Sequence, residues 1–120
     1  MYRLEITLMG LPSTPNARRH FRVVAKENAA WYAAVRASVG LNKPEKPLES
    51  AKLTLTRMST GEPDYDNLAA SFKSVVDGLR YAGVLADDKK KNIGRPEYRW
   101  ERAAQRKGCV KIIVEEIVNG

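Results

Sequence analysis

The sequence has few of the residues that form disulfides and zinc sites. Cys109 is its single cysteine and His20 its single histidine, which excludes an intrachain disulfide and a zinc site made from Cys and His ligands. It also contains no Gly-rich phosphate loop, no dinucleotide-binding fingerprint and no Cys/His nucleophile pair. These absences favour a reducing, cytoplasmic setting and a function that needs no small-molecule cofactor.

Long hydrophobic runs are missing as well. No stretch of about 18 apolar residues occurs, and the opening "MYRLEITLMG" lacks the basic start and apolar run of a signal peptide. We therefore expect a soluble protein with no membrane partner. With 43% apolar residues, the 120-residue chain can bury a core without disulfides or structural metal, so we predict a single domain over residues 1–120.

Acidic residues are the scarcer of the two charge types. The chain has 21 Lys and Arg against 14 Asp and Glu, which gives a net charge of +7. Such a positive field attracts polyanions, nucleic acid first, although excess charge also serves solubility. One basic cluster lies near the N-terminus (Arg18, Arg19, His20, Arg22), and a second lies between residues 89 and 107 (Lys89, Lys90, Lys91, Arg95, Arg99, Arg102, Arg106, Lys107).

Hydrophobic periodicity predicts a small α+β domain. Apolar residues alternate with polar ones over residues 2–10 and 51–59, as in half-buried strands, whereas residues 24–39 and 66–83 repeat apolar positions at helical spacing. The segments 95–103 and 109–118 read as an antiparallel hairpin joined by a Gly-containing turn. The resulting order β-α-β-α-β-β predicts a mixed sheet with two main helices packed on one face.

The second predicted helix gathers acids in a basic chain. Its core-facing stripe is Leu68, Phe72, Val75, Val76 and Leu79, and its opposite face carries Asp66, Lys73, Asp77 and Arg80. Asp64 precedes the helix, and the pair Asp87 and Asp88 follows it. Helix capping explains one aspartate at the helix start, and a surface ion pair explains Lys73 with Asp77. Capping does not explain the second aspartate or the acidic pair directly before three lysines.

A magnesium site would explain all of these carboxylates. Mg²⁺ prefers oxygen ligands and is held in many enzymes by one or two carboxylates together with substrate phosphates. Along a straight helix, Asp66 and Asp88 would lie roughly 30 Å apart. The hypothesis therefore requires the helix to end near Tyr81 and the chain to fold back, or a partner subunit to complete the site.

The motifs "DYDNL", "KSVVDGL" and "AGVLADD", after an upstream "LPSTPNARRH", resemble the RusA family of Holliday junction resolvases, which are often phage-borne. The likeness spans nearly the whole chain. It implies a small α+β homodimer that uses Mg²⁺ or Mn²⁺ to place symmetric nicks across a four-way DNA junction. By residue, it implies metal-binding carboxylates at Asp64, Asp66 and Asp88, a catalytic Lys73, and supporting roles for Asn67, Asp77 and Asp87.

The chain departs from the family pattern at one point. The lysine of the pattern stands four residues after the second motif aspartate, a place that Ala70 occupies here, and Lys73 lies three residues further on. If one insertion of three residues is assumed after Asn67, Lys73 and both later acidic motifs again match the family pattern. Positions four and seven residues after Asp66 lie on the same helix face as Asp66. Lys73 therefore stays on that face, about 4.5 Å further along the axis than Ala70.

The remaining candidates concern DNA binding. Phosphate contacts are predicted at Asn16, Arg18, Arg19, Arg22, Lys89, Lys90 and Lys91, which position DNA without reading its sequence. A solvated loop is the alternative for residues 12–22. His20 is read as a DNA-side or structural residue, and the aromatic rings of Trp31, Tyr98 and Trp100 are expected to pack against the core rather than stack on bases.

The sequence as a whole predicts a Mg²⁺-dependent, structure-selective endodeoxyribonuclease of DNA recombination and repair. It would act as a homodimer on branched DNA, in a bacterial or phage-infected cell. A non-catalytic module that binds branched or single-stranded nucleic acid is the alternative. A nuclease of the same chemistry that acts on flaps or forks is a third reading.

Overall fold

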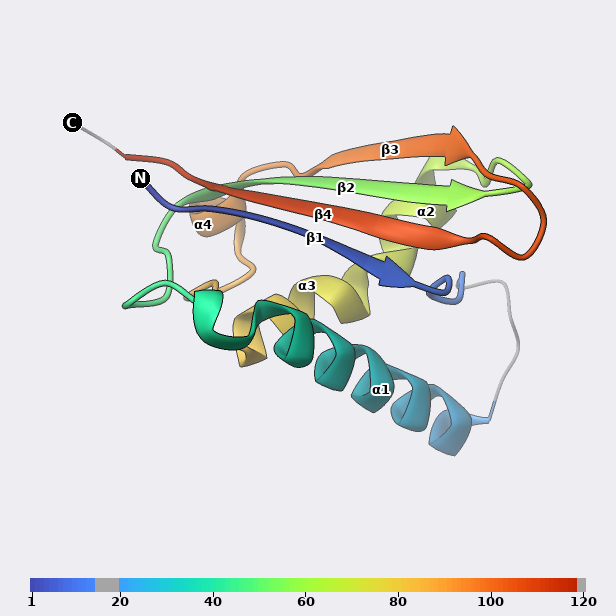
Figure 1. Cartoon of the computed structure of the whole chain (residues 1–120), viewed down its shortest axis with the longest axis horizontal. Helices are drawn as coiled ribbons and strands as arrows, with labels where there is room; N and C mark the ends of the chain where they lie inside the picture. The colour runs from blue at the N-terminus through green and yellow to red at the C-terminus, as the bar shows by residue number, and fades with distance from the viewer. Residues whose placement is uncertain (15–19, 119–120) are drawn as a thin grey trace.

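The computed structural model describes residues 1–14 and 20–118. It has the predicted α+β architecture, in which one four-stranded sheet is covered on one face by the helices (Figure 1). In chain order, the elements are β1 (Arg3–Met9), α1 (Phe21–Val39), the 3-10 turn η1 (Gly40–Asn42), β2 (Ala51–Ser59), α2 (Tyr65–Ser71), α3 (Lys73–Tyr81), α4 (Lys90–Ile93), β3 (Glu97–Arg102) and β4 (Cys109–Glu116). Within the described ranges, no helix combines the length and the apolar character needed to cross a membrane.

The strand order is β1-β4-β2-β3, and it corrects one prediction. β4 pairs antiparallel with both β1 and β2, whereas β3 pairs parallel with β2. The predicted hairpin between residues 95–103 and 109–118 is therefore wrong, because β2 lies between the two strands. The apolar β4 takes a central place, where both its edges are paired, and the highly charged β3 takes an edge, where charge discourages pairing with other chains.

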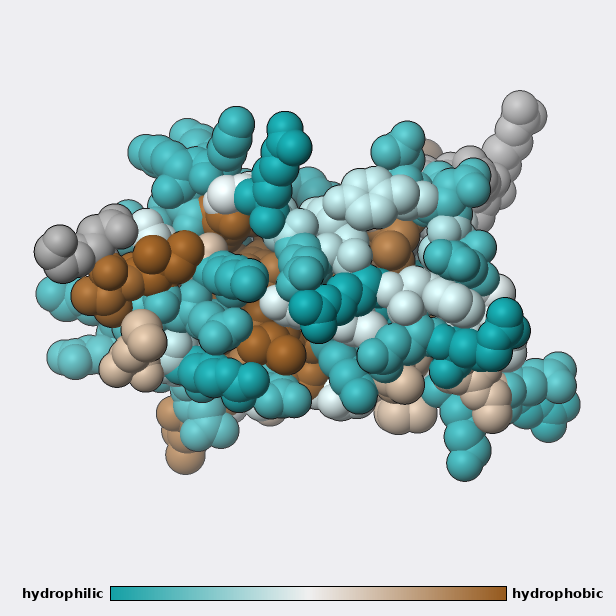
Figure 2. All heavy atoms as spheres, turned by 90° about the horizontal axis from the view of Figure 1, so that it is seen from above, coloured by the Kyte–Doolittle hydropathy of each residue, from teal (hydrophilic) through white to brown (hydrophobic). Residues whose placement is uncertain are grey.

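The core lies between the sheet and the helices. On the inner face, Ile6 and Leu55 flank Ile112 in register, and all three are buried. The expected helical stripe from Leu68 to Leu79 is buried against this face. No helix of the described residues covers the other face of the sheet, and hydrophilic residues predominate on it (Figure 2).

The predicted helix over residues 66–83 is broken in two at Phe72. Phe72 has φ −88° and ψ 0°, in the sparsely populated bridge region. Its N–H donates to the Ala69 carbonyl at 3.2 Å, three residues back, whereas a regular α-helix bonds four residues back. The Ser71 hydroxyl donates to the Leu68 carbonyl at 2.7 Å. The Phe72 side chain is fully buried, so the core fixes the position of this break.

The first helix begins at Phe21, three residues before the predicted start. His20 precedes it, and the His20 Nδ1 atom accepts a hydrogen bond from the Arg22 N–H at 3.2 Å. The imidazole thus serves as the cap that Ser or Asp provides in other helices, which is the structural role among the two predicted for His20. At the other end, Gly40 adopts a φ of 51° and ends the helix as expected.

Helices α1 and α3 approach closely at Gly78. A β-carbon at this position would lie 3.1 Å from Cγ2 and 3.2 Å from Cβ of Val35, which is fully buried. Replacement of glycine by alanine inside a helix normally stabilises by about 0.5–1 kcal/mol. Here the added methyl group meets a packed side chain that has no room to move.

We therefore expect Gly78→Ala to lower the free energy of unfolding by about 1–3 kcal/mol, because it overpacks the helix contact. Urea denaturation followed by circular dichroism measures this change. The same substitution in a Val35→Ala background should cost much less, since the nearest atom is then gone. A stabilised Gly78→Ala protein would contradict the close contact.

Candidate active site

The chain folds back after α3 and brings the two acidic segments together. α3 ends at Tyr81, and Gly83, with a φ of 83°, turns the chain. A backbone bridge then anchors the return, since the Leu48 N–H donates to the Val84 carbonyl at 2.9 Å and the Ala86 N–H donates to the Leu48 carbonyl at 3.0 Å. The early helix end and the return of the chain, which the metal hypothesis requires, are both present.

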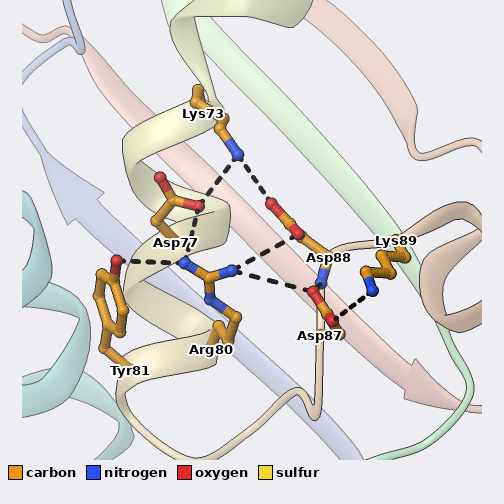
Figure 3. Close-up of polar contacts among 7 residues, drawn as sticks. All are labelled: Lys73, Asp77, Arg80, Tyr81, Asp87, Asp88 and Lys89. Atoms are coloured by element: carbon orange, nitrogen blue, oxygen red, sulfur yellow. Dashed lines mark hydrogen bonds and ion pairs between the residues drawn. The ribbon is translucent and has the colours of Figure 1, made fainter.

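Asp88 lies against the exposed face of α3 in a cluster of charges (Figure 3). The Lys73 Nζ atom donates to Asp88 Oδ2 at 2.7 Å and to Asp77 Oδ1 at 3.2 Å. We call the residues Lys73, Asp77, Arg80, Asp87 and Asp88 the charge cluster. α3 supplies both of its cations, and each of its three carboxylates has one of them within ion-pair distance.

Arg80 is the second cation of the charge cluster. Its guanidinium lies 3.6 Å from Asp88, 3.7 Å from Asp77 and 3.8 Å from Asp87. It also donates to the Tyr81 hydroxyl at 3.1 Å and lies over the Tyr81 ring. Arg80 was expected on this helix face but not as a member of the site, because its role depends on the returning chain.

A cavity of about 650 Å³ opens beside the charge cluster, between α2, α3, α4 and the start of β3. We call it the main cavity. Asp66, Lys73 and Asp88 line it together, although they come from three separate segments. Lys90 and Arg95 contribute positive charge to its wall, and apolar side chains complete it (Val76, Ile93, Pro96, Tyr98).

The close contact perturbs both partners in the way expected of an ion pair. The hydrogen bond from the Lys73 ammonium holds the pKa of the Asp88 carboxyl below its ordinary value, against the effect of partial burial. In turn, the hydrogen bond to Asp88 raises the pKa of Lys73, with a further contribution from Asp77. Both groups are therefore charged at neutral pH.

The donor set of the main cavity suits Mg²⁺. Asp66 and Asp88 supply two carboxylates on one cavity, and Mg²⁺ is held in many phosphoryl-transfer sites by two carboxylates, waters and substrate phosphate. Asp64 does not line the cavity. It stands exposed before α2 without a side-chain capping hydrogen bond. Over residues 1–14 and 20–118, no three His, Cys, Asp or Glu side chains converge closely enough to hold an ion by themselves.

The residues predicted to bind DNA are distributed unevenly. Asn16, Arg18 and Arg19 fall outside the described residues. Arg22 is exposed in the first turn of α1, with its guanidinium 5.9 Å from the Phe21 ring centre.

The three lysines after the acidic pair have different surroundings. Lys89 lies 3.8 Å from Asp87, and Lys91 is exposed in α4, which is a short helix where a loop was expected. Only Lys90 lines the main cavity.

Two further wall residues were not predicted. Arg95 and Tyr98 reach the main cavity because β3 runs parallel to β2 and begins beside α4. The predicted hairpin would have placed this segment elsewhere. The basic cluster between residues 89 and 107 was the sequence signal that pointed to Arg95.

No protein-family model matches the chain, and a search of curated proteins finds no match either. The resemblance of the aspartate and lysine motifs to the RusA family therefore stays a prediction. It rests on those motifs alone, since no homologous protein bears on it.

The Lys73–Asp88 pair predicts the titration of Asp88. In Lys73→Met, the Asp88 pKa should rise toward its ordinary value of about 3.9, because the hydrogen bond that lowers it most is lost, while the smaller effects of Asp87 and Arg80 remain. Carboxyl-carbon NMR titration of the metal-free protein measures it. Lys89→Met is the matched control and should leave the Asp88 pKa unchanged, since Lys89 pairs with Asp87.

The sign of the stability effect follows from the same pair. Because the folded-state pKa of Asp88 is lowered, its stabilising contribution is present above the ordinary carboxyl pKa and is lost as pH falls through the lowered pKa. The contribution of Lys73, whose folded-state pKa is raised, is lost only as pH rises through that raised pKa. On acidification from about pH 5 to about pH 2, the free energy of unfolding of Lys73→Met should therefore fall less than that of the native protein. The difference is the contribution of the Lys73–Asp88 pair.

Proposed function

We propose that the protein is a Mg²⁺-dependent endodeoxyribonuclease that cuts branched DNA, with the main cavity as its active site. One observation supports this most: Asp66, Lys73 and Asp88, remote in sequence, line a single cavity whose wall also carries Lys90 and Arg95. Acids inside a basic surface suit phosphodiester hydrolysis, because bases attract the polyanion while carboxylates retain the cation.

Asp66 and Asp88 would hold the metal ion. A bound Mg²⁺ polarises the phosphoryl group and promotes ionisation of an attacking water. Asp64 stands two residues before Asp66 and is the third carboxylate implied by the resemblance. The flanking Asp77 and Asp87 keep Lys73 and Arg80 in place, which orients Asp88 toward the cavity side of α3.

Lys73 has the position to act on the substrate. Its side chain is 68% exposed, so its ammonium can reach a phosphate without leaving the cluster entirely. On substrate binding, Lys73 transfers one of its hydrogen bonds from Asp88 to a non-bridging phosphate oxygen. Asp88 would then be free to hold a cation, and the ammonium stabilises negative charge that develops in the transition state.

A homodimer and a four-way junction are the partners that fit this chemistry. Paired cuts on two strands of a symmetric junction call for two active sites related by a two-fold axis. Resolution of such junctions belongs to DNA recombination and repair. Lys90 and Arg95 hold the backbone of the strand that enters the main cavity, and phosphate contacts of this kind carry no base specificity.

One observation favours the alternative of a non-catalytic nucleic-acid module. Each carboxylate of the charge cluster is already matched by Lys73, Arg80 or Lys89. On that reading, the acids orient the cations that bind DNA. Both readings share the basic surface and differ in whether the carboxylates are needed for a chemical step.

Conversion of Asp66 or Asp88 to asparagine separates these readings. We expect either substitution to lower Mg²⁺-dependent cutting of a synthetic four-way junction by at least about 10³-fold, because metal binding is lost. Junction binding should remain or become tighter, since negative charge near phosphate is removed. Gel analysis of end-labelled junctions, flaps and forks measures cutting and substrate choice.

Glu45→Gln is the matched control, because Glu45 is an exposed acid on the connector before β2, away from the main cavity. It should cut normally. Asp64→Asn tests the third carboxylate, and a loss equal to that of Asp66→Asn would show that all three are needed. Native protein that binds junctions but never cuts any branched substrate with Mg²⁺ or Mn²⁺ would leave the binding module as the function.

The basic wall predicts a salt dependence. Lys90→Met and Arg95→Met should each weaken junction binding and reduce the slope of log K against log salt by about 1, because each removes one phosphate contact. Fluorescence anisotropy across a salt series gives the slopes. Lys46→Met, an exposed lysine on the connector, should leave the slope unchanged.

A further inference from the structure

Most of the sulfur-containing residues of the chain lie in one row across the sheet. The chain contains three methionines and one cysteine. Met9 on β1 pairs directly with Cys109 on β4, and Cys109 pairs on its other side with Met58 on β2. We call these three residues the sulfur row. Only Met1, which is exposed at the start of the chain, lies outside it.

The sulfur row lies on the outer face of the sheet, which no helix of the described residues covers (Figure 1). Side chains alternate between the two faces along a strand. Val110 on β4 and Leu8 on β1 belong to the core, so Cys109 and Met9, their neighbours along the chain, point to the opposite face. Directly paired residues of antiparallel strands share a face, and Met58 therefore joins them.

Two of the sulfurs are already in contact. The Cys109 thiol donates a hydrogen bond to the Met58 Sδ atom, with 3.6 Å between the two sulfurs. A three-coordinate ion with metal–sulfur bonds of about 2.3 Å holds its sulfurs about 4 Å apart. The observed separation is therefore close to one edge of such a site.

Met9 is placed to supply the third sulfur. The β-carbons of directly paired residues lie about 4.5–5.5 Å apart, and the methionine side chain has three rotatable bonds. Met9 is 72% exposed, so its thioether has room to turn over Cys109. Three strands thus bring one thiol and two thioethers to a single place on the surface.

The donor set selects soft, monovalent metal ions. Thiolate and thioether ligands suit Cu(I), whereas Zn²⁺ requires further nitrogen, thiolate or carboxylate ligands. Over residues 1–14 and 20–118, no three His, Cys, Asp or Glu side chains converge to provide them. Packing in a hydrophobic core is the ordinary use of methionine. None of the three residues of the sulfur row belongs to the core, so packing there does not account for the row.

We propose that the sulfur row binds one Cu(I) ion, with Cys109 as a thiolate ligand and Met9 and Met58 as thioether ligands. The S–H bond of Cys109 breaks as the sulfur–copper bond forms, and the proton passes to solvent, so the net charge of the protein with its ion is unchanged. A bound ion joins β1, β4 and β2 at one end of the sheet and should also stabilise the fold. This inference is independent of the proposed nuclease function.

Methionine methyl NMR with Ag(I) as the probe tests the ligand set. Ag(I) is a soft, monovalent and diamagnetic ion. In protein with isotope-labelled methionine methyl groups, one equivalent of Ag(I) should shift the signals of Met9 and Met58 and leave that of Met1 in place. Met1 is therefore a control within the same molecule, and Met9→Leu and Met58→Leu assign the other two signals.

Competition with the chelator bicinchoninate, under anaerobic and reducing conditions, measures the affinity for Cu(I) itself. Met9→Leu and Met58→Leu nearly conserve volume and should each weaken binding at least about tenfold, because even the partners behind metal ligands contribute about 10–100-fold. Cys109→Ser should abolish binding, since the thiolate is lost. Thr7→Val is the matched control, because Thr7 is exposed on the same face of β1 and carries no sulfur.

Three results would overturn the proposal. Met9 and Met58 signals that stay in place with Ag(I), or a Met1 signal that shifts as much as theirs, would show that the row is not a site. Cu(I) affinity that both leucine variants retain would mean that Cys109 binds as an isolated thiol. Circular dichroism of each variant confirms that the fold is kept.

Discussion

The parallel pairing of β2 with β3 is the constraint on which the arrangement of the site depends. Parallel neighbours cannot be joined by a tight turn, so the chain must cross from one end of the sheet to the other. In this protein the crossover comprises α2, α3, the return past Leu85 and α4. All five aspartates of the chain lie on it. The connection required by sheet geometry therefore also carries the acids, and two of its segments, α3 and the chain just before α4, meet where Lys73 contacts Asp88.

The charge cluster shows how a basic protein can keep several carboxylates side by side. Each carboxylate lies near a cation of α3 or near Lys89, which precedes α4, and the pairs are only partly buried, so the desolvation cost stays small. The arrangement has consequences for a ligand. Lys73 and Arg80 hold Asp88 in a defined position, and in the proposed nuclease Lys73 is exposed enough to exchange its partner for a phosphate.

Local patterns in the sequence were sufficient for the four strands, for the two main helical segments and for the buried face, but not for α4. The alternation of Leu4, Ile6 and Leu8 and the helical stripe ending at Leu79 correspond to the core that the structure contains. Strand pairing was not accessible in this way, because the same alternation fits a hairpin and a parallel edge strand equally well. The break of the long helix at Phe72 was not accessible either, because Phe72 fits the apolar stripe of one continuous helix.

The site was predictable to the extent that it depends on the helix face. Spacing placed Lys73, Asp77 and Arg80 together, and the hypothesis of a returning chain placed Asp88 nearby. The contact itself depends on the turn at Gly83 and on the backbone bridge between Leu48 and Leu85, which join segments far apart in sequence. Arg95 reaches the main cavity for the same kind of reason, through the direction of β3.

The closeness of α1 and α3 has a further consequence. These two helices line opposite sides of a cavity of about 290 Å³, with Trp31 on α1 and Ser74 on α3, and they approach closely where Gly78 leaves room for Val35. The residue at position 78 therefore governs the width of an opening that it does not itself line. A larger side chain there would spread the two walls and change the size of the cavity, while every lining residue kept its chemical identity.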